Sequence, residues 1–330
     1  MRALGPFARF QIFVFTLAVF GLGLAQGFTP RNPTCIAPAD PGGGWDFTCR
    51  NIATLLSDIG AVRGRLRTQN MPGAGGGVAY AHVVGQQSGN DNLIVAASTA
   101  TTTRIAQGQF SGFDEDDVRW VAALGADYGV IAVSPDSPYD DLTELMEALR
   151  AEPASLSIVG ASAVGGWDHL KVLLVAQAAG LENLSALRYV SFSSGGQAIV
   201  ELLGGRAEVF SGDVSEALPQ IEAGNLKVLG ILAEERADGL LAEVPTAAEQ
   251  GYDVVGANWR GFYMPAGTSD EAYTFWVEAF RELEASEAYA TVRQQSGLSP
   301  FWRGGEEMTA FVYDEVETIR ELSEQINLTE

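Results

Sequence analysis

Apolar residues along the chain follow two spacings, one typical of amphipathic helices and one typical of buried strands. The helical spacing i, i+3, i+4 and i+7 is formed by Ile52, Leu55, Leu56 and Ile59. Short continuous apolar runs are instead typical of strands that are buried on both faces. Such runs cover residues 93–97 and 129–133, and residues 156–159 are also predicted to form a strand. Because predicted strands alternate with predicted helices, the pattern favours an α/β fold built on parallel sheets.

Loops rich in glycine or serine lie between several predicted strands and the helices that follow them. They cover residues 41–46, 70–77, 160–168 and 192–196. Glycine allows positive φ and a close approach of backbone N–H groups to a ligand, and a helix N-terminus adds unpaired donors with partial positive charge. Since open α/β sheets bind ligands at the carboxyl ends of their strands, we expect these loops to converge on an anion-binding cleft between two domains. Any one loop alone could equally be an ordinary connection.

Two of these loops share the motif Gly-Gly-Trp-Asp, which ends at Trp45-Asp46 in the first and at Trp167-Asp168 in the other. Tryptophan usually packs in a core, but the repeated motif suggests related loops that face each other across the cleft, with at least one ring against the ligand. Asp46, Asp168 and Asp213 could cap helices or accept hydrogen bonds from a ligand.

Length and charge narrow the classes of function. A chain of 330 residues, 47% of them hydrophobic, is long enough for two domains. Its first 25 residues combine Arg2 and Arg9 with an apolar run at 12–24 and small residues before Ala25, which predicts a secretory signal peptide cut after that residue. A permanent anchor is the alternative, although the run is short for a membrane span. The net charge of −22 makes nucleic acid and anionic membranes poor partners.

The two cysteines, Cys35 and Cys49, lie on either side of the first glycine loop. Export would place them in an oxidising compartment, where we predict that they form a disulfide. A helix packed on a sheet lies about 10 Å away, whereas the Cα atoms of a disulfide lie within about 7 Å of each other. The bond therefore requires the start of the helix to approach the strand, and two buried thiols are the alternative.

Signatures of catalysis, metal binding and cofactor binding are weak. The histidines are His82 and His169, and Ser162 does not lie in a G-x-S-x-G nucleophile elbow. The cysteines and histidines have no convincing metal-ligand spacing, and the glycine loops match neither the dinucleotide fingerprint nor the Walker motif. We therefore predict a binding protein that is not an enzyme and that holds no metal and no cofactor. An exported hydrolase that uses Ser162 and His169 is the alternative from another class.

Several short segments form an ordered set of motifs along the chain, at residues 41–46, 70–76, 160–166, 189–196, 203–205, 244–252 and 259–263. In combination and in order, this set resembles the extracytoplasmic solute receptors of tripartite tricarboxylate transporters, the family that includes the Bordetella-type uptake receptors. The string Cys35-Ile36-Ala37-Pro38 with Cys49, together with residues 117–120 and 211–213, is most similar to the citrate-receptor branch.

The resemblance implies a periplasmic-binding-protein type II fold, in which two α/β domains joined by hinge crossings close on a ligand in the cleft between them. After the signal peptide at 1–25, domain 1 would consist of residues 26–127 and 260–330, and domain 2 of residues 128–259. The crossings themselves would lie near residues 128–133 and 260–264.

The resemblance also implies a periplasmic receptor, expected to be a monomer, that delivers a small carboxylate to the permease subunits of its transporter. Citrate or another tricarboxylate is the expected ligand, and a dicarboxylate or an aromatic carboxylate is the alternative. Such an anion requires at least one cation, for which Arg260 and Arg50 are the candidates. Ser98 and Thr99 could contact the ligand or simply cap a helix. The complete predicted ligand site is Gly42, Gly43, Gly44, Trp45, Asp46, Gly75, Gly76, Ser98, Thr99, Ala161, Ser162, Gly165, Gly166, Trp167, Asp168, Ser194, Gly195, Asp213 and Arg260.

Overall fold

The computed structural model describes residues 27–41, 44–62, 64–192 and 194–328. Gly42 and Gly43 of the first glycine loop and the predicted signal peptide lie outside this part of the chain. Within it, no helix combines the length and the apolar character needed to cross a membrane.

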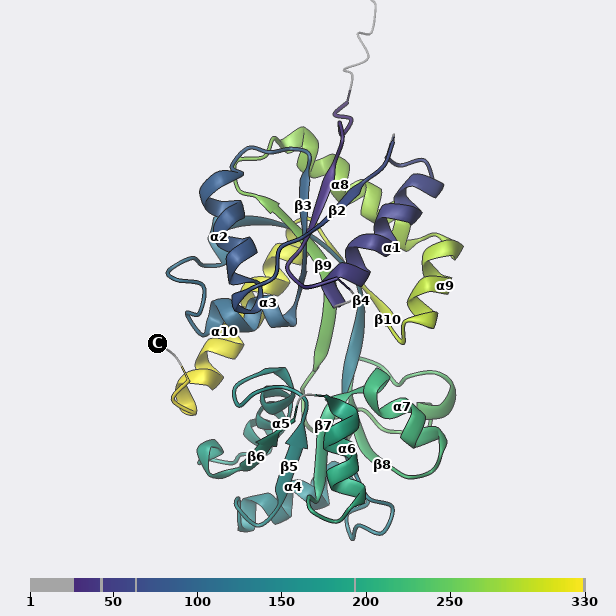
Figure 1. Ribbon diagram of the computed structural model, residues 1–330. Helices are drawn as coiled ribbons and strands as arrows, with labels where there is room; N and C mark the ends of the chain where they lie inside the picture. Colours follow the sequence, from purple (N-terminus) through teal and green to yellow (C-terminus); the bar gives the residue numbers. More distant parts are fainter. Residues whose placement is uncertain (1–26, 42–43, 63, 193, 329–330) are drawn as a thin grey trace, which may run out of the picture.

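Two lobes are stacked on each other and joined by two long strands, β4 and β9 (Figure 1). The upper lobe contains β1 (Thr34–Ala37), α1 (Gly44–Asp58), β2 (Arg67–Asn70), η1 (Ala74–Gly76), α2 (Gly77–Gln86), β3 (Leu93–Ser98), α3 (Thr99–Ala106), α8 (Asp270–Glu284), α9 (Glu287–Gln295), β10 (Ser299–Gly304) and α10 (Glu306–Gln325). The lower lobe contains α4 (Leu142–Ala151), β5 (Ser157–Gly160), α5 (Trp167–Ala178), β6 (Arg188–Ser191), α6 (Gly195–Leu203), β7 (Val209–Asp213), α7 (Val214–Glu222) and β8 (Lys227–Leu232). The connecting strands are β4 (Val118–Val133) and β9 (Ala257–Pro265).

A single mixed sheet runs through both lobes in the order β2-β1-β3-β9-β4-β7-β5-β6, with β8 and β10 also paired to β4. The pairs β1–β2, β1–β3, β5–β6 and β5–β7 are parallel, whereas every pair that involves β4 or β9 is antiparallel. The predicted parallel sheets therefore form the outer part of each lobe. In the upper lobe β9 runs against the outer strands, and in the lower lobe β4 does, because β4 and β9 run in opposite directions where they join the lobes.

The chain passes between the lobes at two neighbouring points. Up to Tyr128, β4 pairs with β9, and from Gly129 onward it pairs with β7 and β8. At the second passage, the N–H of Gly129 donates to Gly256 O at 2.8 Å. This passage lies before the predicted crossing at 260–264, because Arg260 already pairs with β3 of the upper lobe. The division of the whole chain into residues 26–127 plus 260–330 and residues 128–259 remains a prediction.

Glycine is required at the first passage because the chain there runs against a lysine side chain. A Cβ atom on Gly129 would lie 2.5 Å from Cδ of Lys171, closer than two carbon atoms can pack. At this passage, strand β4 therefore packs against Lys171 in the first half of α5.

The apolar spacing found in the sequence accounts for the elements that frame the cleft. In α1, Ile52, Leu55 and Leu56 are buried as the helical spacing predicts, and all six residues of β3 are buried. The side chain of Asp141 caps α4 by accepting a hydrogen bond from Glu144 N at 2.9 Å.

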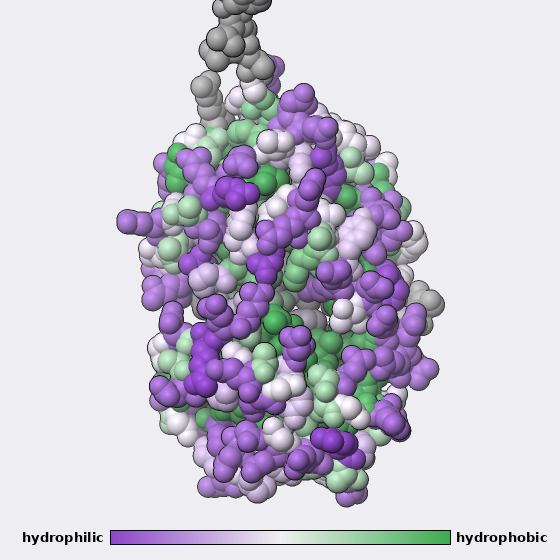
Figure 2. All heavy atoms as spheres, turned by 180° about the vertical axis from the view of Figure 1, so that it is seen from behind, coloured by the Kyte–Doolittle hydropathy of each residue, from purple (hydrophilic) through white to green (hydrophobic). Residues whose placement is uncertain are grey.

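The two lobes also touch through the C-terminal helix. Helix α10 packs against α3 of the upper lobe and contacts α5 of the lower lobe. At its end, Gln325 O accepts a hydrogen bond from Ser185 Oγ at 3.2 Å. From behind, apolar residues gather at and just below the waist between the lobes (Figure 2). A cavity of about 260 Å³ near the hinge is lined by apolar side chains of both lobes, among them Val254, Phe301 and Phe311.

Cys35 of β1 and Cys49 of α1 form a disulfide, with their Cα atoms 5.8 Å apart. Both residues are fully buried, so the start of α1 does approach the strand. The bond closes a loop of about 15 residues around the first glycine turn, and a loop of that size is expected to contribute about 3 kcal/mol.

We therefore expect the double substitution Cys35→Ala and Cys49→Ala to lower the free energy of unfolding by about 3 kcal/mol, because the unfolded chain gains freedom around the first glycine turn. Urea denaturation of the variant and of wild type, with and without dithiothreitol, measures the loss. The reductant should destabilise wild type and leave the variant unchanged. Equal stability of the two proteins would contradict the prediction.

Candidate functional site

A cavity of about 380 Å³ lies between the two lobes. Its upper wall is the exposed side of α3 and the residues that follow it, and its lower wall is the loop before α5 together with the starts of α5 and α7. The lining residues are Ala100, Thr103, Arg104, Gln107, Gln109, Ala161, Ser162, Ala163, Val164, Gly166, Trp167, Asp168, Asp213, Glu216 and Asn258. Three of the predicted loops or strand ends therefore line one cleft, namely the hydroxyl-rich run after β3, the loop at 160–168 and the end of β7. We call this cavity the α3–α5 cavity.

Arg104 is the basic side chain that lines the α3–α5 cavity. It lies in the last turn of α3 and donates a hydrogen bond to Gln109 Oε1. Gly75 makes room for the guanidinium, since a Cβ on that residue would lie 2.9 Å from Arg104 Nε. Gly75 also has a positive φ of 59°, which glycine adopts without strain. Sequence reasoning missed Arg104, although the run of hydroxyl residues that leads to it was recognised.

The loop before α5 is held in shape by Asp168. One carboxylate oxygen, Oδ2, accepts hydrogen bonds from the backbone N–H groups of Ala161 at 2.8 Å and Ser162 at 2.9 Å. In return, Ser162 Oγ accepts a hydrogen bond from Asp168 N at 2.9 Å. Asp168 is buried, and its carboxylate orders the loop around the cavity that it lines.

Lys171 connects this loop to the neighbouring strand. Its ammonium is fully buried and lies 2.8 Å from Asp168 Oδ1 and 2.5 Å from Asp213 Oδ1. Burial alone would lower the pKa of Lys171, but the charges and hydrogen bonds of the two carboxylates outweigh it and raise the pKa above its ordinary value. Lys171 is therefore charged at neutral pH and draws the start of α5 toward the end of β7.

Hydrogen bonds continue from Asp213 to the hinge. Asn258 of β9 donates from Nδ2 to Asp213 Oδ2 at 2.7 Å, and its Oδ1 accepts from Arg260 Nη1 at 2.7 Å. A connected series of polar contacts thus runs from Arg260 through Asn258, Asp213 and Lys171 to Asp168. It ties the strand that joins the lobes to the loop that lines the α3–α5 cavity.

A second cavity, of about 290 Å³, lies next to Arg260 between the start of α1, the start of α7 and helix α9. Gly44, Asp127 and Ser215 also line it. Asp127 is buried and accepts hydrogen bonds from Ser215 N at 3.2 Å and from Ser215 Oγ. Arg260 therefore faces a different cavity from Arg104, although Asn258, which contacts Arg260, lines the α3–α5 cavity.

The two tryptophans of the repeated motif have different surroundings. Trp45 donates from Nε1 to Ser98 Oγ at 3.1 Å, and its ring lies 3.4 Å from the position of a Cβ on Gly76. Trp167 lines the α3–α5 cavity, and only 9% of its surface is exposed. Its buried Nε1 has no acceptor among the residues that the structure describes. Because buried polar groups are nearly always hydrogen-bonded, this N–H is a candidate donor to a ligand.

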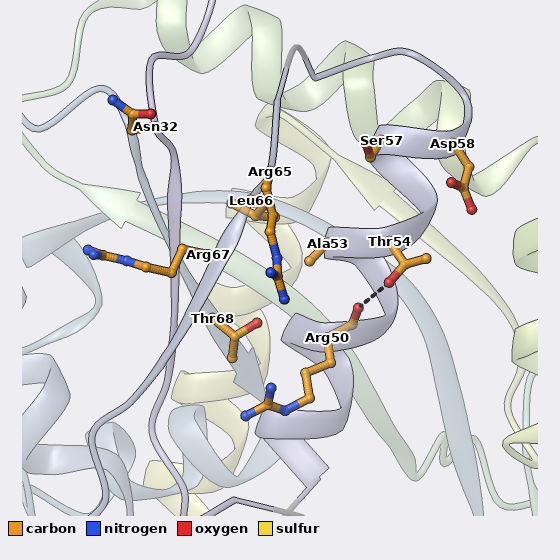
Figure 3. Close-up of a pocket in the computed structure, with 10 residues that line it drawn as sticks. All are labelled: Asn32, Arg50, Ala53, Thr54, Ser57, Asp58, Arg65, Leu66, Arg67 and Thr68. Carbon is orange, nitrogen blue, oxygen red and sulfur yellow. Dashed lines mark hydrogen bonds between the residues drawn. The ribbon is translucent and has the colours of Figure 1, made fainter.

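Asp46 and Arg50, from the first loop and its helix, pair with each other instead of facing the α3–α5 cavity. Arg50 Nε lies 2.8 Å from Asp46 Oδ2, and Asn70 Nδ2 donates to Asp46 Oδ1 at 2.8 Å. The side chain of Arg50 lines a groove on the outside of the upper lobe (Figure 3). The sequence allowed either a ligand contact or a helix-face salt bridge for Arg50, and the described contacts are those of the salt bridge.

In the structure, the hydroxyl residues that were predicted as ligand contacts either cap helices around the cleft or connect them to neighbouring strands. Ser98 caps α3 by accepting from Ala100 N at 3.3 Å. Thr99 donates to Ala257 O at 2.8 Å and so joins α3 to the hinge strand. Ser194 caps α6, and the N–H of Gly195 donates to Glu216 Oε1 at 3.2 Å.

Glu216 belongs to the lining of the α3–α5 cavity, so the loop at 192–196 reaches that cavity through this side chain. Burial, reinforced by the charges of Asp168 and Asp213, raises the pKa of Glu216 above its ordinary value. Glu216 thus places a third carboxyl group beside Asp168 and Asp213 at the lower wall of the cavity.

One hydrogen bond across the cleft joins the lobes at the edge of the α3–α5 cavity. Gln107 Nε2 donates to Gly165 O at 2.7 Å and also lies 3.3 Å from Ser323 Oγ of α10. Gly165 has a φ of 80°, a conformation that favours glycine. The structure therefore shows the lobes in contact on the side of α3 and α5.

Ser162 and His169 do not contact each other as a nucleophile and its base would. The described hydrogen bonds of Ser162 Oγ involve Asp168 N and Tyr189 OH. His169 Nδ1 accepts from Gly165 N at 3.0 Å, and burial lowers the pKa of His169 to about 4. The histidine therefore supports the loop as a neutral acceptor. Within the described residues, no group of three or more His, Cys, Asp or Glu side chains is arranged to hold a metal ion.

Because carboxyl groups are buried near the hinge, we expect the free energy of unfolding to fall as the pH rises from about 6.5 to 8. Burial, reinforced by Asp213, raises the pKa of Asp127 from 3.8 to about 7, and burial also raises that of Glu315 to about 7. The folded chain therefore binds more protons than the unfolded chain in this window, and it loses stability as they dissociate. His169 acts in the opposite direction, but below about pH 6.5.

We expect Asp127 to account for a loss on the order of 1 kcal/mol across this window. Urea unfolding at a series of pH values measures it. Asp127→Asn should flatten the slope, because the amide resembles the protonated acid, whereas the exposed control Asp136→Asn should follow wild type. A slope that Asp127→Asn leaves unchanged would contradict the assignment.

The chain is similar to a known family over most of its length. The family description "Tripartite tricarboxylate transporter family receptor" matches residues 65–328. BugT of Bordetella pertussis is 25% identical over 310 residues, which cover 93% of this chain and 92% of that protein.

Two solved structures show the same fold. A TctC solute-binding protein from Polaromonas aligns with a TM-score of 0.78 and 22% identity, over 88% of this chain and 97% of that one. MatC from Rhodopseudomonas palustris with bound malate aligns with a TM-score of 0.65 and 21% identity, over 89% and 99%.

Proposed function

The chain belongs to the family of tripartite tricarboxylate transporter receptors, which are periplasmic solute-binding proteins and not enzymes, and we propose that it captures citrate or another tricarboxylate between its lobes. We further propose that it is exported with residues 1–25 removed and that it delivers the ligand, as a monomer, to the permease subunits of its transporter.

The observation that carries this proposal is the position of Arg104 in the α3–α5 cavity. Its guanidinium lies on the upper wall, opposite the glycine loop of the lower lobe. A guanidinium can hold a carboxylate through two parallel hydrogen bonds. Trp167 lines this cavity and also the apolar cavity near the hinge, and its Nε1, which has no acceptor among the described residues, is a further donor within reach of the cleft. A ligand bound here would touch both lobes and so favour their contact.

A dicarboxylate is the second candidate, because several carboxyl groups surround the same cavity. Asp168, Asp213 and Glu216 all line it, and Lys171 is already engaged with two of them. A ligand with fewer negative charges meets less repulsion from these groups. The relative with bound malate shows that this fold accommodates a C4 dicarboxylate. An aromatic carboxylate would in addition meet the part of Trp167 that lines the cavity.

A thermal-shift screen of the chain that starts at Gln26 tests the proposal. Citrate, isocitrate, tricarballylate, malate, succinate and terephthalate are added separately, and hits are titrated by calorimetry. A ligand at about 100 times its dissociation constant adds about 2.7 kcal/mol of stability, which gives a clear shift. A shift with the tricarboxylates alone supports the first candidate, and a shift with malate alone supports the second. No shift with any carboxylate would overturn both.

A further inference from the structure

A wide groove lies outside the cleft, around the free edge of the sheet in the upper lobe. Its volume is about 1010 Å³. Figure 3 shows residues of α1 on one side of strand β2 and Asn32 and Arg67 on the other, so the groove surrounds the edge of the strand. The lining residues are Asn32, Arg50, Ala53, Thr54, Ser57, Asp58, Arg65, Leu66, Arg67 and Thr68.

The charge of this groove is opposite to that of the whole protein. The chain has 42 acidic and 20 basic residues, yet residues 50–67 contain four arginines and a single acidic residue, Asp58. Arg50, Arg65 and Arg67 line the groove, and Arg50 is also paired with Asp46. An excess of cations on one face of a strongly acidic protein creates a local field that attracts an anionic partner.

The strand at the centre of the groove has an open edge. Among the strands that the structure describes, β2 ends the sheet and pairs with β1 alone. The N–H of Arg67 donates to Pro33 O, just before β1, and the N–H of Met71 donates to Ala37 O of β1. Because strand residues alternate in direction, the N–H groups of Thr68 and Asn70 point to the open edge. An extended peptide can bind such an edge through main-chain hydrogen bonds while its side chains contact both faces.

We propose that this groove binds an acidic, extended segment of a partner protein, which adds as a strand beside β2 and places its carboxylates against Arg50, Arg65 and Arg67. The side chains of an added strand would alternate between the face of Arg67 and Asn32 and the face of α1. The groove extends to both faces, so it has room for both sets.

Two other occupants fit the groove less well. A second copy of the chain that pairs β2 with β2 would bring the arginines of both copies together, and such like charges across a strand pair are destabilising. An anionic membrane would attract the arginines but repel the rest of a protein with a net charge of −22. An acidic peptide is small enough to contact the basic groove alone.

The proposal is tested with a fluorescently labelled peptide of repeated Glu-Thr dipeptides. Its binding to the protein is measured by fluorescence anisotropy at low salt. We expect Arg65→Glu with Arg67→Glu to weaken binding by at least about tenfold, since both charges are reversed. Hydrogen exchange should show that the peptide protects the amides of Thr68 and Asn70. A repeated Glu-Pro peptide carries the same charge but cannot form a strand ladder, so it should bind more weakly and give no protection.

The matched control is Arg150→Glu with Arg188→Glu, which reverses two exposed arginines of the lower lobe, one of them on the opposite edge strand β6. This variant should bind the Glu-Thr peptide as wild type does.

Equal losses in the two variants, or no binding by wild type, would overturn the proposal. Equal binding of the Glu-Pro peptide would contradict strand pairing and leave only a basic patch. Stronger binding to phosphatidylserine vesicles than to the Glu-Thr peptide would contradict a peptide partner and point to a membrane surface. Carboxylate affinity should be unchanged in both variants, so the result is independent of the proposed function.

Discussion

Replacing Lys171 with methionine is expected to lower the free energy of unfolding by about 3–5 kcal/mol, because the substitution leaves buried carboxylates without their cation. The ammonium is fully buried and contacts Asp168 and Asp213. Methionine keeps most of the apolar volume of the lysine stem, so the loss should come from charge and not from packing. Urea unfolding, followed by circular dichroism, measures the effect.

A triple variant separates charge from packing. When Lys171→Met is combined with Asp168→Asn and Asp213→Asn, no charge remains unpaired in the group, and most of the lost stability should return. The matched control is Lys227→Met, which removes the partly exposed lysine that pairs with Asp140 and should cost less than about 1 kcal/mol. A Lys171→Met protein within about 1 kcal/mol of wild type would contradict the role that we assign to this ion pair.

The ion pairs of Lys171 show why the sequence predicted the region around α5 only in outline. The glycine loop at 160–168 and the helix after it were predicted from local sequence. The pairing of Lys171 with Asp213 could not be predicted in this way, because it depends on how α5 packs against β7. A lysine in an apolar helix gives no sign of its partner when that partner is 42 residues away in the chain.

The connecting strands show a similar limit. The apolar run at 129–133 was recognised as a strand, yet β4 begins at Val118 and pairs with different strands in each lobe. The predicted crossing at 260–264 came from the resemblance, and the chain crosses earlier because Arg260 lies in the ladder with β3. Strand pairing is a non-local property, so the position of the hinge had to come from the structure.

The cations were the least predictable part of the candidate site. Arg50 was considered because it follows the first glycine loop, but Asp46 lies four residues before it and forms a helical ion pair with it. Arg104 lies in α3, and it reaches the cleft because η1, with Gly75 at its centre, leaves room for the guanidinium. That geometry involves a backbone conformation about 30 residues away, which periodicity does not reveal.

Replacing Arg104 with glutamine is expected to weaken carboxylate binding by about 30-fold or more while leaving the fold intact. Removing one partner of a close, partly buried charge pair costs about 2–5 kcal/mol, much of it because the other charge stays unpaired. Glutamine keeps a donor that can reach Gln109, so α3 should be preserved. Calorimetric titration with the carboxylate that gives the largest thermal shift measures the loss, and Arg150→Gln on the exposed face of α4 is the control for a lost positive charge.

The comparison with Arg260→Gln decides which cavity holds the ligand. Arg260 lines the second cavity and contacts Asn258, so its loss should disturb the polar series at the hinge and weaken binding less than the loss of Arg104. If Arg104→Gln bound the carboxylate like wild type and Arg260→Gln did not, the ligand would lie beside α1 and Asp127 instead. Its affinity would then rise as the pH falls through about 7, because protonation of Asp127 removes a negative charge from that cavity.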